Sequence, residues 1–268
     1  MSANTKREKL KEHFRSLLNS HMESFTKAIA DPKGDWVVKG FVDIAKNVYT
    51  ISDDTKVISK ILELLLFPNI CKFAEQAKFK IHLSREQNHY PDLTFVDVSG
   101  NKFAVDLKTT YRSDNNNING MTLGAFTGYF RERDSVKNIT FPYSSYVGHF
   151  ALGILYTRSD QEINERKMYT IEQLSEIPSV LKDFQFFVQE KYKIASDLPG
   201  SGNTKNIGSV KNISSLVSGS GPFSALGEDT FNDYWMYYLT KDMARGLDLP
   251  KAPYRNLEEY HAYKRKGK

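Results

Sequence analysis

The fold of this chain is constrained most by two apolar segments, residues 92–97 and 102–108, that flank a short polar stretch. The stretch Val98-Ser99-Gly100-Asn101 has the composition of a tight turn, so the two segments predict a β-hairpin. Successive residues of a strand point to opposite faces. In the second segment this places Phe103, Val105 and Leu107 on one face, and Ala104, Asp106 and Lys108 on the other. The apolar face requires a core to cover it.

Helices and further strands are predicted on both sides of this hairpin. Residues 5–30 have apolar residues at helical spacing and predict one amphipathic helix, while residues 35–51 predict a second hairpin. A helix should begin at Asp54 or Thr55 and bend or restart at Pro68. We also expect strands at 146–157 and 184–194, helices at 121–133, 228–245 and 256–265, and a Gly/Ser/Asn loop at 197–221. This mixture predicts an α/β (α+β) fold.

Composition limits the kind of protein this chain can be. Of 268 residues, 40% are hydrophobic and 26% are charged, as in globular proteins and unlike disordered ones. No apolar run approaches the roughly 20 residues of a membrane span, and the charged N-terminus lacks a signal-peptide pattern, so we expect a cytoplasmic protein. The single cysteine, Cys71, has apolar neighbours and is expected to be a buried structural thiol.

Positive charge is concentrated towards the C-terminus. The net charge is +5, and residues 241–268 contribute +4 of it, with eight Lys or Arg against four Asp or Glu. Residues 198–227 contain no acidic side chain. Contact with a phosphate backbone would favour this distribution, although a solubilising tail beside a polar loop would produce the same pattern.

The predicted hairpin brings two carboxylates together. If the turn centres on Ser99 and Gly100, facing positions add up to about 199, so Asp92 lies within one register step of Asp106. Carboxylate oxygens are ligands that Mg²⁺ prefers, and Lys108 could stabilise charge or position a water molecule. The cluster therefore suits phosphodiester hydrolysis. A surface hairpin with an ordinary salt bridge is the alternative.

Pro91-Asp92 followed by Asp106-Leu107-Lys108 is typical of the PD-(D/E)XK nuclease superfamily. From about Asp35 to its C-terminus, the chain resembles the EcoRV-like type II restriction endonucleases. The resemblance rests on short stretches in the same order and at similar spacing: Asp54 to Val57, Gln87 to Asp92, Asp106 to Tyr111, Thr122 to Gly124, Lys137 to Ile139, Glu176 to Pro178, Gly200 to Thr204, and Asp233 to Trp235.

The resemblance implies a restriction-endonuclease-like core, with a mixed central sheet flanked by helices. It also implies a division into an N-terminal helix and dimerisation hairpin, 1–53, and a catalytic and DNA-binding domain, 54–268. Asp92, Asp106 and Glu63 match the family's metal-binding or assisting carboxylates, and Lys108 matches its catalytic lysine, so the implied cofactor is Mg²⁺. For Glu63, a solvated ion pair with Lys60 is the alternative.

Residues that contact double-stranded DNA are implied in the same way. The loop Gly200-Ser201-Gly202-Asn203-Thr204 matches the loop that reads the major groove, and Gln87 and Asn88 match a loop near the minor groove. Contacts with backbone phosphates are expected at four further positions, Thr110, Thr122, Lys137 and Arg245. A plain flexible turn at 200–204 is the alternative, and His89 is expected to be structural.

The resemblance implies a homodimer that cuts both strands of a palindrome, with residues 35–51 in the dimer interface. The target implied by the matching loops is GATATC, with a blunt cut at its centre. Departures from the family pattern are a longer N-terminal helix, Gly128, Pro199 and the segment 245–255. The alternatives are a structure-selective resolvase or repair nuclease, and a non-catalytic DNA-binding module.

Overall fold

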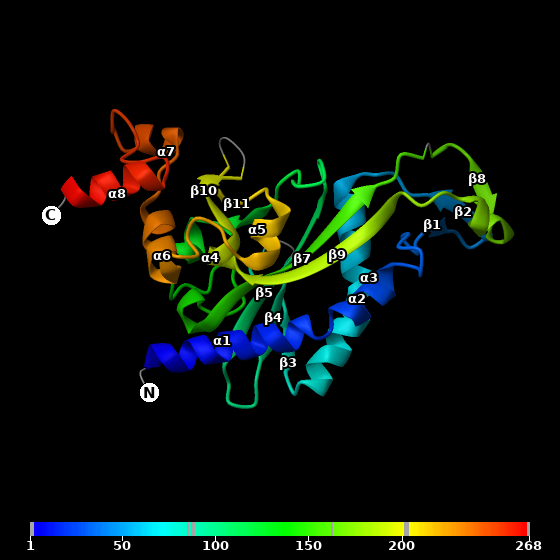
Figure 1. Ribbon diagram of the computed structural model, residues 1–268, viewed down its shortest axis with the longest axis horizontal. Helices are drawn as coiled ribbons and strands as arrows, with labels where there is room; N and C mark the ends of the chain where they lie inside the picture. The colour runs from blue at the N-terminus through cyan, green and yellow to red at the C-terminus, as the bar shows by residue number, and fades with distance from the viewer. Residues whose placement is uncertain (1–2, 85, 87–88, 162, 201–203, 267–268) are drawn as a thin grey trace.

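The computed structural model describes residues 3–84, 86, 89–161, 163–200 and 204–266. Its centre is a five-stranded sheet of order β3-β4-β5-β7-β9 (Figure 1). The strands are β3 (Lys80–Leu83), β4 (Leu93–Val96), β5 (Lys102–Tyr111), β7 (Tyr146–Arg158) and β9 (Leu181–Glu190). Neighbours are antiparallel except β5 and β7, which are parallel. The predicted central hairpin, the strand at 146–157 and the mixed sheet are confirmed. The strand predicted at 184–194 is confirmed only as far as Glu190, because residues 191–194 form a short helix.

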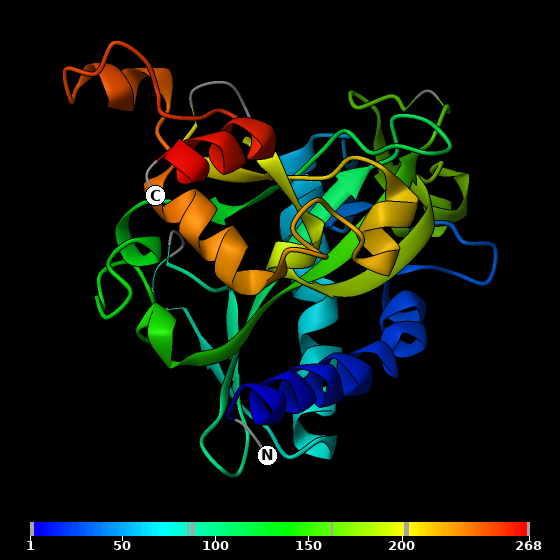
Figure 2. The ribbon, with the colours of Figure 1, turned by 60° about the vertical axis from the view of Figure 1, so that its left-hand side comes forward.

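Three N-terminal helices share one core with a face of this sheet (Figures 1 and 2). They are α1 (Ala3–Asn19), α2 (Met22–Ile29) and α3 (Thr55–Gln76). Phe14 of α1 stacks on Phe103 of β5, with ring centroids 4.4 Å apart. Phe103 and Val105 are buried in this core, and partly buried Leu107 packs against it. The predicted apolar face of the hairpin is therefore confirmed.

The single helix predicted over residues 5–30 is wrong, because the structure divides it at Ser20 and His21. The hydroxyl of Ser20 donates to the carbonyl of Leu17 over 2.7 Å, and the amide of His21 donates to Leu18 instead of Leu17. The Ser20 hydroxyl thus occupies the Leu17 carbonyl, which would have accepted the amide of His21 in a continuing helix. Helix α2 restarts at Met22 and buries Phe25 in the same core.

Helix α3 begins where the sequence predicts, but the restart allowed for at Pro68 does not occur. Asp54 caps it by accepting hydrogen bonds from the amides of Lys56 and Val57 over 2.9 and 3.0 Å. The helix runs through Pro68 without interruption. The prediction for Cys71 is wrong, since this side chain is exposed. Its neighbours Ile70 and Phe73 occupy the buried face, and at 3.6 residues per turn Cys71 points away from them.

The opposite face of the sheet is covered by a second core and a small three-stranded sheet of order β10-β11-β6. Its strands are β6 (Thr122–Ala125), β10 (Ala195–Pro199) and β11 (Asn206–Ser209), and the helices nearby are α4 (Lys191–Ile194) and α5 (Ile213–Ser218). Three short 3-10 helices complete the loops, Gly128–Phe130, Tyr143–Ser145 and Ile171–Glu176.

Two predictions fail in this region. Residues 121–133 do not form the predicted helix: Gly124 has a φ angle of +87°, which a right-handed helix excludes, and β6 instead pairs with β11, so that only Gly128–Phe130 form a short 3-10 helix. The long loop predicted at 197–221 is largely regular structure, because it contains β11, α5 and the end of β10. Within that range, residues 201–203 lie outside the described part of the chain.

The C-terminal part forms three helices, α6 (Gly227–Tyr237), α7 (Lys241–Arg245) and α8 (Leu257–Lys266). The single helix predicted at 228–245 is therefore wrong. It is divided at Tyr238, whose backbone is extended, and the hydroxyl of Thr240 accepts from the amide of Met243 to start α7. The helix predicted at 256–265 is confirmed as α8. In both views α7 and α8 lie away from α1 (Figures 1 and 2).

The predicted hairpin at 35–51 is confirmed as β1 (Gly40–Val42) and β2 (Asn47–Thr50), which pair antiparallel. Strand β8 (Met168–Thr170) extends it to a three-stranded sheet at one end of the molecule (Figure 1). Apolar side chains of this hairpin face solvent: Phe41 is 53% exposed, Val42 56% and Ile44 fully. Among the described residues, none of the helices is both long and apolar enough to cross a membrane.

Candidate active site

The open end of the hairpin β4–β5 brings the predicted carboxylates face to face. The paired residues run from Leu93↔Val105 to Val96↔Lys102, so facing positions add up to 198 instead of the expected 199. The turn is set by Asp97, whose carboxylate accepts from the amides of Ser99 and Asn101 over 2.8 and 2.9 Å. Continuing this register by one residue places Asp92 opposite Asp106, and not opposite Leu107.

Hydrogen bonds fix this arrangement. The amide of Leu107 donates to Oδ2 of Asp92 over 2.7 Å, and the amide of Asp92 donates to Oδ1 of Asp106 over 3.3 Å. The second oxygen of Asp106, Oδ2, lies 3.2 Å from Nζ of Lys108. The structure thus brings together the three residues that the sequence had grouped.

Asp92 and Asp106 carry like charges, and both side chains are shielded from solvent, which shifts the pKa values in the cluster. Burial and the charge of Asp106 together raise the pKa of Asp92 to about 6, against the opposing effects of Lys108 and the amide of Leu107. Burial lowers the pKa of Lys108, but the charges of Asp106 and Asp92 together outweigh it, and the net direction is upward. Lys108 therefore remains a cation beside the carboxylate pair.

Glu63 lies on α3 and is half-exposed. Its carboxylate is 2.8 Å from Nζ of Lys60, which is the ion pair considered as the alternative role. The charge of Glu63 also raises the pKa of Asp92, so the two carboxylates are in electrostatic contact. Glu63 thus pairs with Lys60 and also acts on the charge of Asp92.

The chemistry of the carboxylate pair fits a divalent cation. Asp92 is partly buried and Asp106 buried, so their charges repel each other, and an ion between them would remove the repulsion that raises the pKa of Asp92. Within the described ranges, no group of three or more His, Cys, Asp or Glu side chains is arranged to hold a metal. Mg²⁺ suits a pair better than most metals, because it keeps several waters and takes further oxygens from substrate phosphates.

The residues expected to contact DNA are placed unequally. Thr122 is exposed on β6 and lies beside Gly200, where a Cβ atom would come within 2.5 Å of the Thr122 methyl group, so only glycine fits there. Lys137 is exposed in a loop. Thr110 is buried and its hydroxyl donates to the carbonyl of Gly120 over 3.0 Å, which gives it a structural role. Thr204 is half-buried next to the loop.

The remaining expected DNA contacts cannot be placed. Gln87, Asn88, Ser201, Gly202 and Asn203 lie outside the described residues. His89, which was expected to be structural, is half-buried, and its amide donates to the carbonyl of Glu86 over 3.0 Å.

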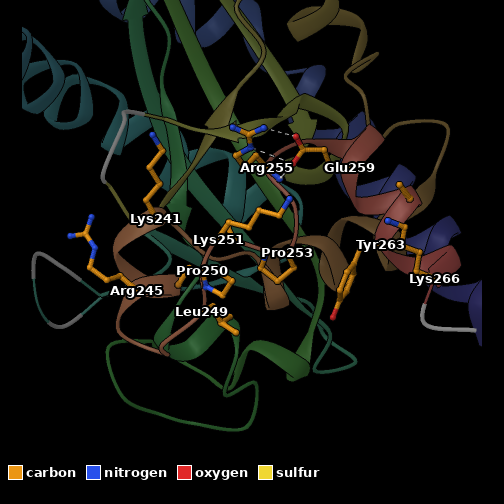
Figure 3. Close-up of a pocket in the computed structure, with 13 residues that line it drawn as sticks. Lys241, Arg245, Leu249, Pro250, Lys251, Pro253, Arg255, Glu259, Tyr263 and Lys266 are labelled. Carbon is orange, nitrogen blue, oxygen red and sulfur yellow. Dashed lines mark hydrogen bonds and ion pairs between the residues drawn. The ribbon is translucent and has the colours of Figure 1, made fainter.

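Arg245 borders a cleft of about 720 Å³ between α7 and α8 (Figure 3). Its side chain is 82% exposed and makes only a 3.6 Å contact with Asp242 among the ion pairs of the described chain. Five cations and one carboxylate line the cleft: Lys241, Arg245, Lys251, Arg255, Lys266 and Glu259. The charge count of the C-terminal segment indicated this surface, but not its shape.

One residue near the carboxylates has no counterpart in the predictions. Lys191, the first residue of α4, is 4% exposed, and its Nζ atom has no hydrogen-bond partner among the described residues. Burial lowers its pKa to about 8, and Asp106 opposes that shift. A lysine in the sequence Gln189-Glu190-Lys191-Tyr192 gives no signal of burial, because its neighbours are mixed in character.

Comparison with known proteins settles which family has this arrangement. The family model described as restriction endonuclease EcoRV matches residues 32–265. The chain belongs to this family. Among characterised relatives, the type II restriction enzyme EcoRV of Escherichia coli is 37% identical over 244 residues, which cover 90% of this chain and 96% of that enzyme. Among solved structures, the NlaIV restriction endonuclease aligns over 97% of this chain and 96% of that one, at 11% identity and a TM-score of 0.37.

Membership of the EcoRV family makes this protein a restriction endonuclease, a nuclease that acts on DNA. The resemblance inferred from the short matching stretches is therefore confirmed, and so is the restriction-endonuclease class of fold. The family match begins at residue 32, so α1 and α2 precede it.

Proposed function

We propose that this EcoRV-family protein is a magnesium-dependent type II endonuclease that hydrolyses double-stranded DNA at GATATC, with a blunt cut at the centre. The observation that carries the catalytic part is the cluster of Asp92, Asp106 and Lys108 at the open end of one hairpin. A non-catalytic DNA-binding module would not need two mutually repelling carboxylates, one buried and one partly buried, beside a lysine.

Asp92 and Asp106 would hold the cation, and Glu63 would assist from α3. When bound, Mg²⁺ supplies a Lewis acid for the phosphate and lowers the pKa of a bound water. Lys108, held 3.2 Å from Asp106, stabilises negative charge on the attacked phosphate. A water oxygen bonds to phosphorus, the bond to the 3′ oxygen breaks, and the products are a 3′ hydroxyl and a 5′ phosphomonoester.

Target choice is assigned to two loops, on the strength of the matching stretches in the sequence. Gly200 to Thr204 would read base edges in the major groove, where an asparagine such as Asn203 pairs bidentately with adenine. Gln87 and Asn88 would lie near the minor groove. Thr122, Lys137 and Arg245 would contact backbone phosphates, while Thr110 would act only through the backbone it holds. A central TA step unstacks easily, which favours cleavage there.

A homodimer would let two identical sites cut the two strands of the palindrome. We assign its interface to the hairpin β1–β2 within the N-terminal unit, 1–53, since Phe41, Val42 and Ile44 expose apolar surface there. The remaining residues, 54–268, would form the catalytic and DNA-binding unit. Analytical ultracentrifugation of Phe41→Ser beside the parent protein tests this assignment. The variant should shift towards monomer, and an unchanged dimer would mean that the interface does not include Phe41.

Digestion of a plasmid with and without Mg²⁺, followed by sequencing of the fragment ends, tests the function itself. Blunt ends within GATATC are expected, and Asp106→Ala serves as the inactive control. Fragment ends at another sequence would refute GATATC as the target but would still show endonuclease activity. Cleavage confined to junctions or branched DNA would favour a structure-selective nuclease.

A further inference from the structure

Asp197 of strand β10 contacts two C-terminal helices, and the proposed mechanism gives it no part. Its backbone carbonyl accepts a hydrogen bond from the hydroxyl of Tyr234 on α6 over 2.6 Å, and its Oδ2 atom accepts from the amide of Leu257 over 3.0 Å. Leu257 is the first residue of α8. A strand residue thus supplies an acceptor for the end of a helix that lies 60 positions further along the chain.

The carboxylate of Asp197 suits the start of α8. The first amides of a helix have no partner within the helix, and they give this end a partial positive charge. Asn256, directly before α8, accepts from the amide of Glu259 over 2.9 Å. The amide of Leu257 donates to Asp197 instead, so this helix end is capped once by its own segment and once by β10. The second contact holds strand and helix together.

Strand β10 leads into the loop Gly200 to Thr204, which is proposed to read bases. The amide of Gly200 donates to the carbonyl of Asn206 over 3.0 Å. A Cβ atom on Gly208 would come within 2.6 Å of the carbonyl oxygen of Leu198, so β10 and β11 approach as closely as a glycine allows. A shift of β10 would therefore move β11 as well, and with it both ends of the loop.

Helix α8 also borders the cationic cleft (Figure 3). Arg255, two residues before the helix, lines this cleft together with Tyr263 and Lys266 of the helix itself. Glu259, in the first turn of α8, holds Arg255 in place, because its carboxylate lies 2.8 Å from Nη2 of Arg255 and accepts the Arg255 amide over 2.9 Å. The start of α8 is thus part of the cleft and is also joined to β10.

We propose that Asp197 is a positioning residue that fixes the distance between the cationic cleft and the loop Gly200 to Thr204, and thereby determines how well the protein discriminates its target from other sequences. This inference rests on the proposed function of the loop and the cleft. Phosphate contacts set the register of a protein on DNA, whereas base contacts read the sequence. Groups that read bases must be held within about 0.5 Å of their productive geometry. Without the hydrogen bond to Leu257, the cleft would still bind DNA, but the loop would read bases less selectively.

Competition binding in Ca²⁺ measures this discrimination as the ratio of the affinities for GATATC and for a site with one base pair altered. Asp197→Ala should lower the ratio about tenfold, the order of magnitude of one hydrogen bond to a charged group, while the affinity for non-specific DNA changes by less than about twofold. Asp197→Asn keeps an oxygen that accepts from the amide of Leu257, and it should retain most of the ratio.

Two control variants separate positioning from other effects of the substitution. Asn256→Ala removes the other cap of α8 but leaves the contact with β10, so it should keep the ratio of the parent protein. Asp229→Ala removes the same charge from the exposed surface of α6 and should also keep it. An equal loss of the ratio in Asn256→Ala and Asp197→Ala would mean that Asp197 acts only through the stability of α8, which refutes the inference.

The parent protein separates the inference from the proposed function. If the parent discriminates and Asp197→Ala does so equally well, the role of Asp197 is refuted and the proposed target stands. If the parent binds both sites equally, the proposed target fails and this inference fails with it. Thermal unfolding verifies folding. Should Asp197→Ala unfold, Leu257→Pro decides the outcome, because it removes the donor at a first helical position, where proline is tolerated, and should lower the ratio to the same extent. A parent-like ratio in Leu257→Pro would refute the inference.

Discussion

The amide of Asp92 donates a hydrogen bond of 3.3 Å to the carboxylate of Asp106, so the backbone of one proposed cation ligand orients the side chain of the other. In return, the amide of Leu107, next to Asp106, donates to the carboxylate of Asp92 over 2.7 Å. Each strand of the hairpin thus holds the carboxylate that projects from its neighbour. The geometry of the pair is a property of the β4–β5 register and should survive the loss of either charge.

Replacing either carboxylate should therefore stop cleavage without unfolding the protein. For Asp106→Asn we expect the cleavage rate under Mg²⁺ to fall at least about a hundredfold, since the group that would hold the cation is weakened. Plasmid cleavage and thermal unfolding measure the two effects. Wild-type cleavage by a folded Asp106→Asn protein would remove the pair from the mechanism.

The raised pKa of Asp92 predicts how stability depends on pH in the absence of divalent cations. The folded protein holds the Asp92 proton up to about pH 6, whereas the unfolded chain releases it near pH 4. The free energy of unfolding contributed by Asp92 therefore decreases as pH rises through this window and stays low above it. Asp92→Asn should be more stable than the parent at neutral pH, by about 1–3 kcal/mol, and no more stable near pH 4.

Urea unfolding in EDTA at several pH values checks this prediction. Asp160→Asn, which alters an exposed carboxylate, is the control and should leave the pH profile unchanged. A destabilised Asp92→Asn protein at neutral pH would mean that the hydrogen bond from Leu107 outweighs the repulsion.

Lys108 should matter for rate more than for binding. Lys108→Ala is expected to slow cleavage at least about a hundredfold, because a cation beside the attacked phosphate is lost. DNA binding measured in Ca²⁺, which takes oxygen ligands but is expected not to support cleavage, should change much less. Lys102→Ala, at the other end of β5, is the control. If Lys108→Ala lost DNA binding while the bound complex still cleaved at the normal rate, Lys108 would be a DNA-contact residue instead of a catalytic one.

The cleft beside Arg245 should contribute electrostatic affinity and no sequence preference. Arg245→Ala is expected to reduce the slope of log affinity against log salt by about 1 and to weaken binding to all sequences alike. Filter binding in Ca²⁺ over a range of salt concentrations measures the slope. Lys72→Ala, an exposed lysine on α3, is the comparison, and an equal change in both variants would show that the cleft has no special part.

Asn203 should affect target choice. Asn203→Ala is expected to lose about 1–3 kcal/mol of discrimination between GATATC and a site with one base pair altered, while weak non-specific binding persists. Competition binding against the altered site gives this quantity. Undiminished discrimination would place base reading outside the Gly200 to Thr204 loop.

Features set by local chemistry were predictable from the sequence. The cap at Asp54 and the turn at Ser99 and Gly100 depend on neighbours within a few residues, and the register was predicted to within one position. The closeness of Asp92 and Asp106 followed from that turn, to within one register step. The exact register depended on Asp97, whose carboxylate organises the turn and which the prediction did not consider.

Features set by distant contacts were not predictable in the same way. Residues 121–133 have enough apolar character for a helix, but β6 is specified by its pairing with β11, more than 80 residues further along the chain. The burial of Lys191 depends on rings from Tyr90 and Phe130 that no local pattern associates with it. The exposure of Cys71 depended on which face of α3 meets the sheet, which its apolar neighbours did not specify.

Helix α1 lies outside the segment that defines the family, yet Phe14 stacks directly on Phe103 of the strand that carries Asp106. Lys11 of the same helix is buried between Glu190 and Glu228, at 3.1 and 2.5 Å. A protein trimmed to residues 32–265 would therefore lack the helix that packs against the strand bearing Asp106. A helix that packs on β5 thus lies outside the matched family segment, and chimaeras with relatives of this protein should retain it.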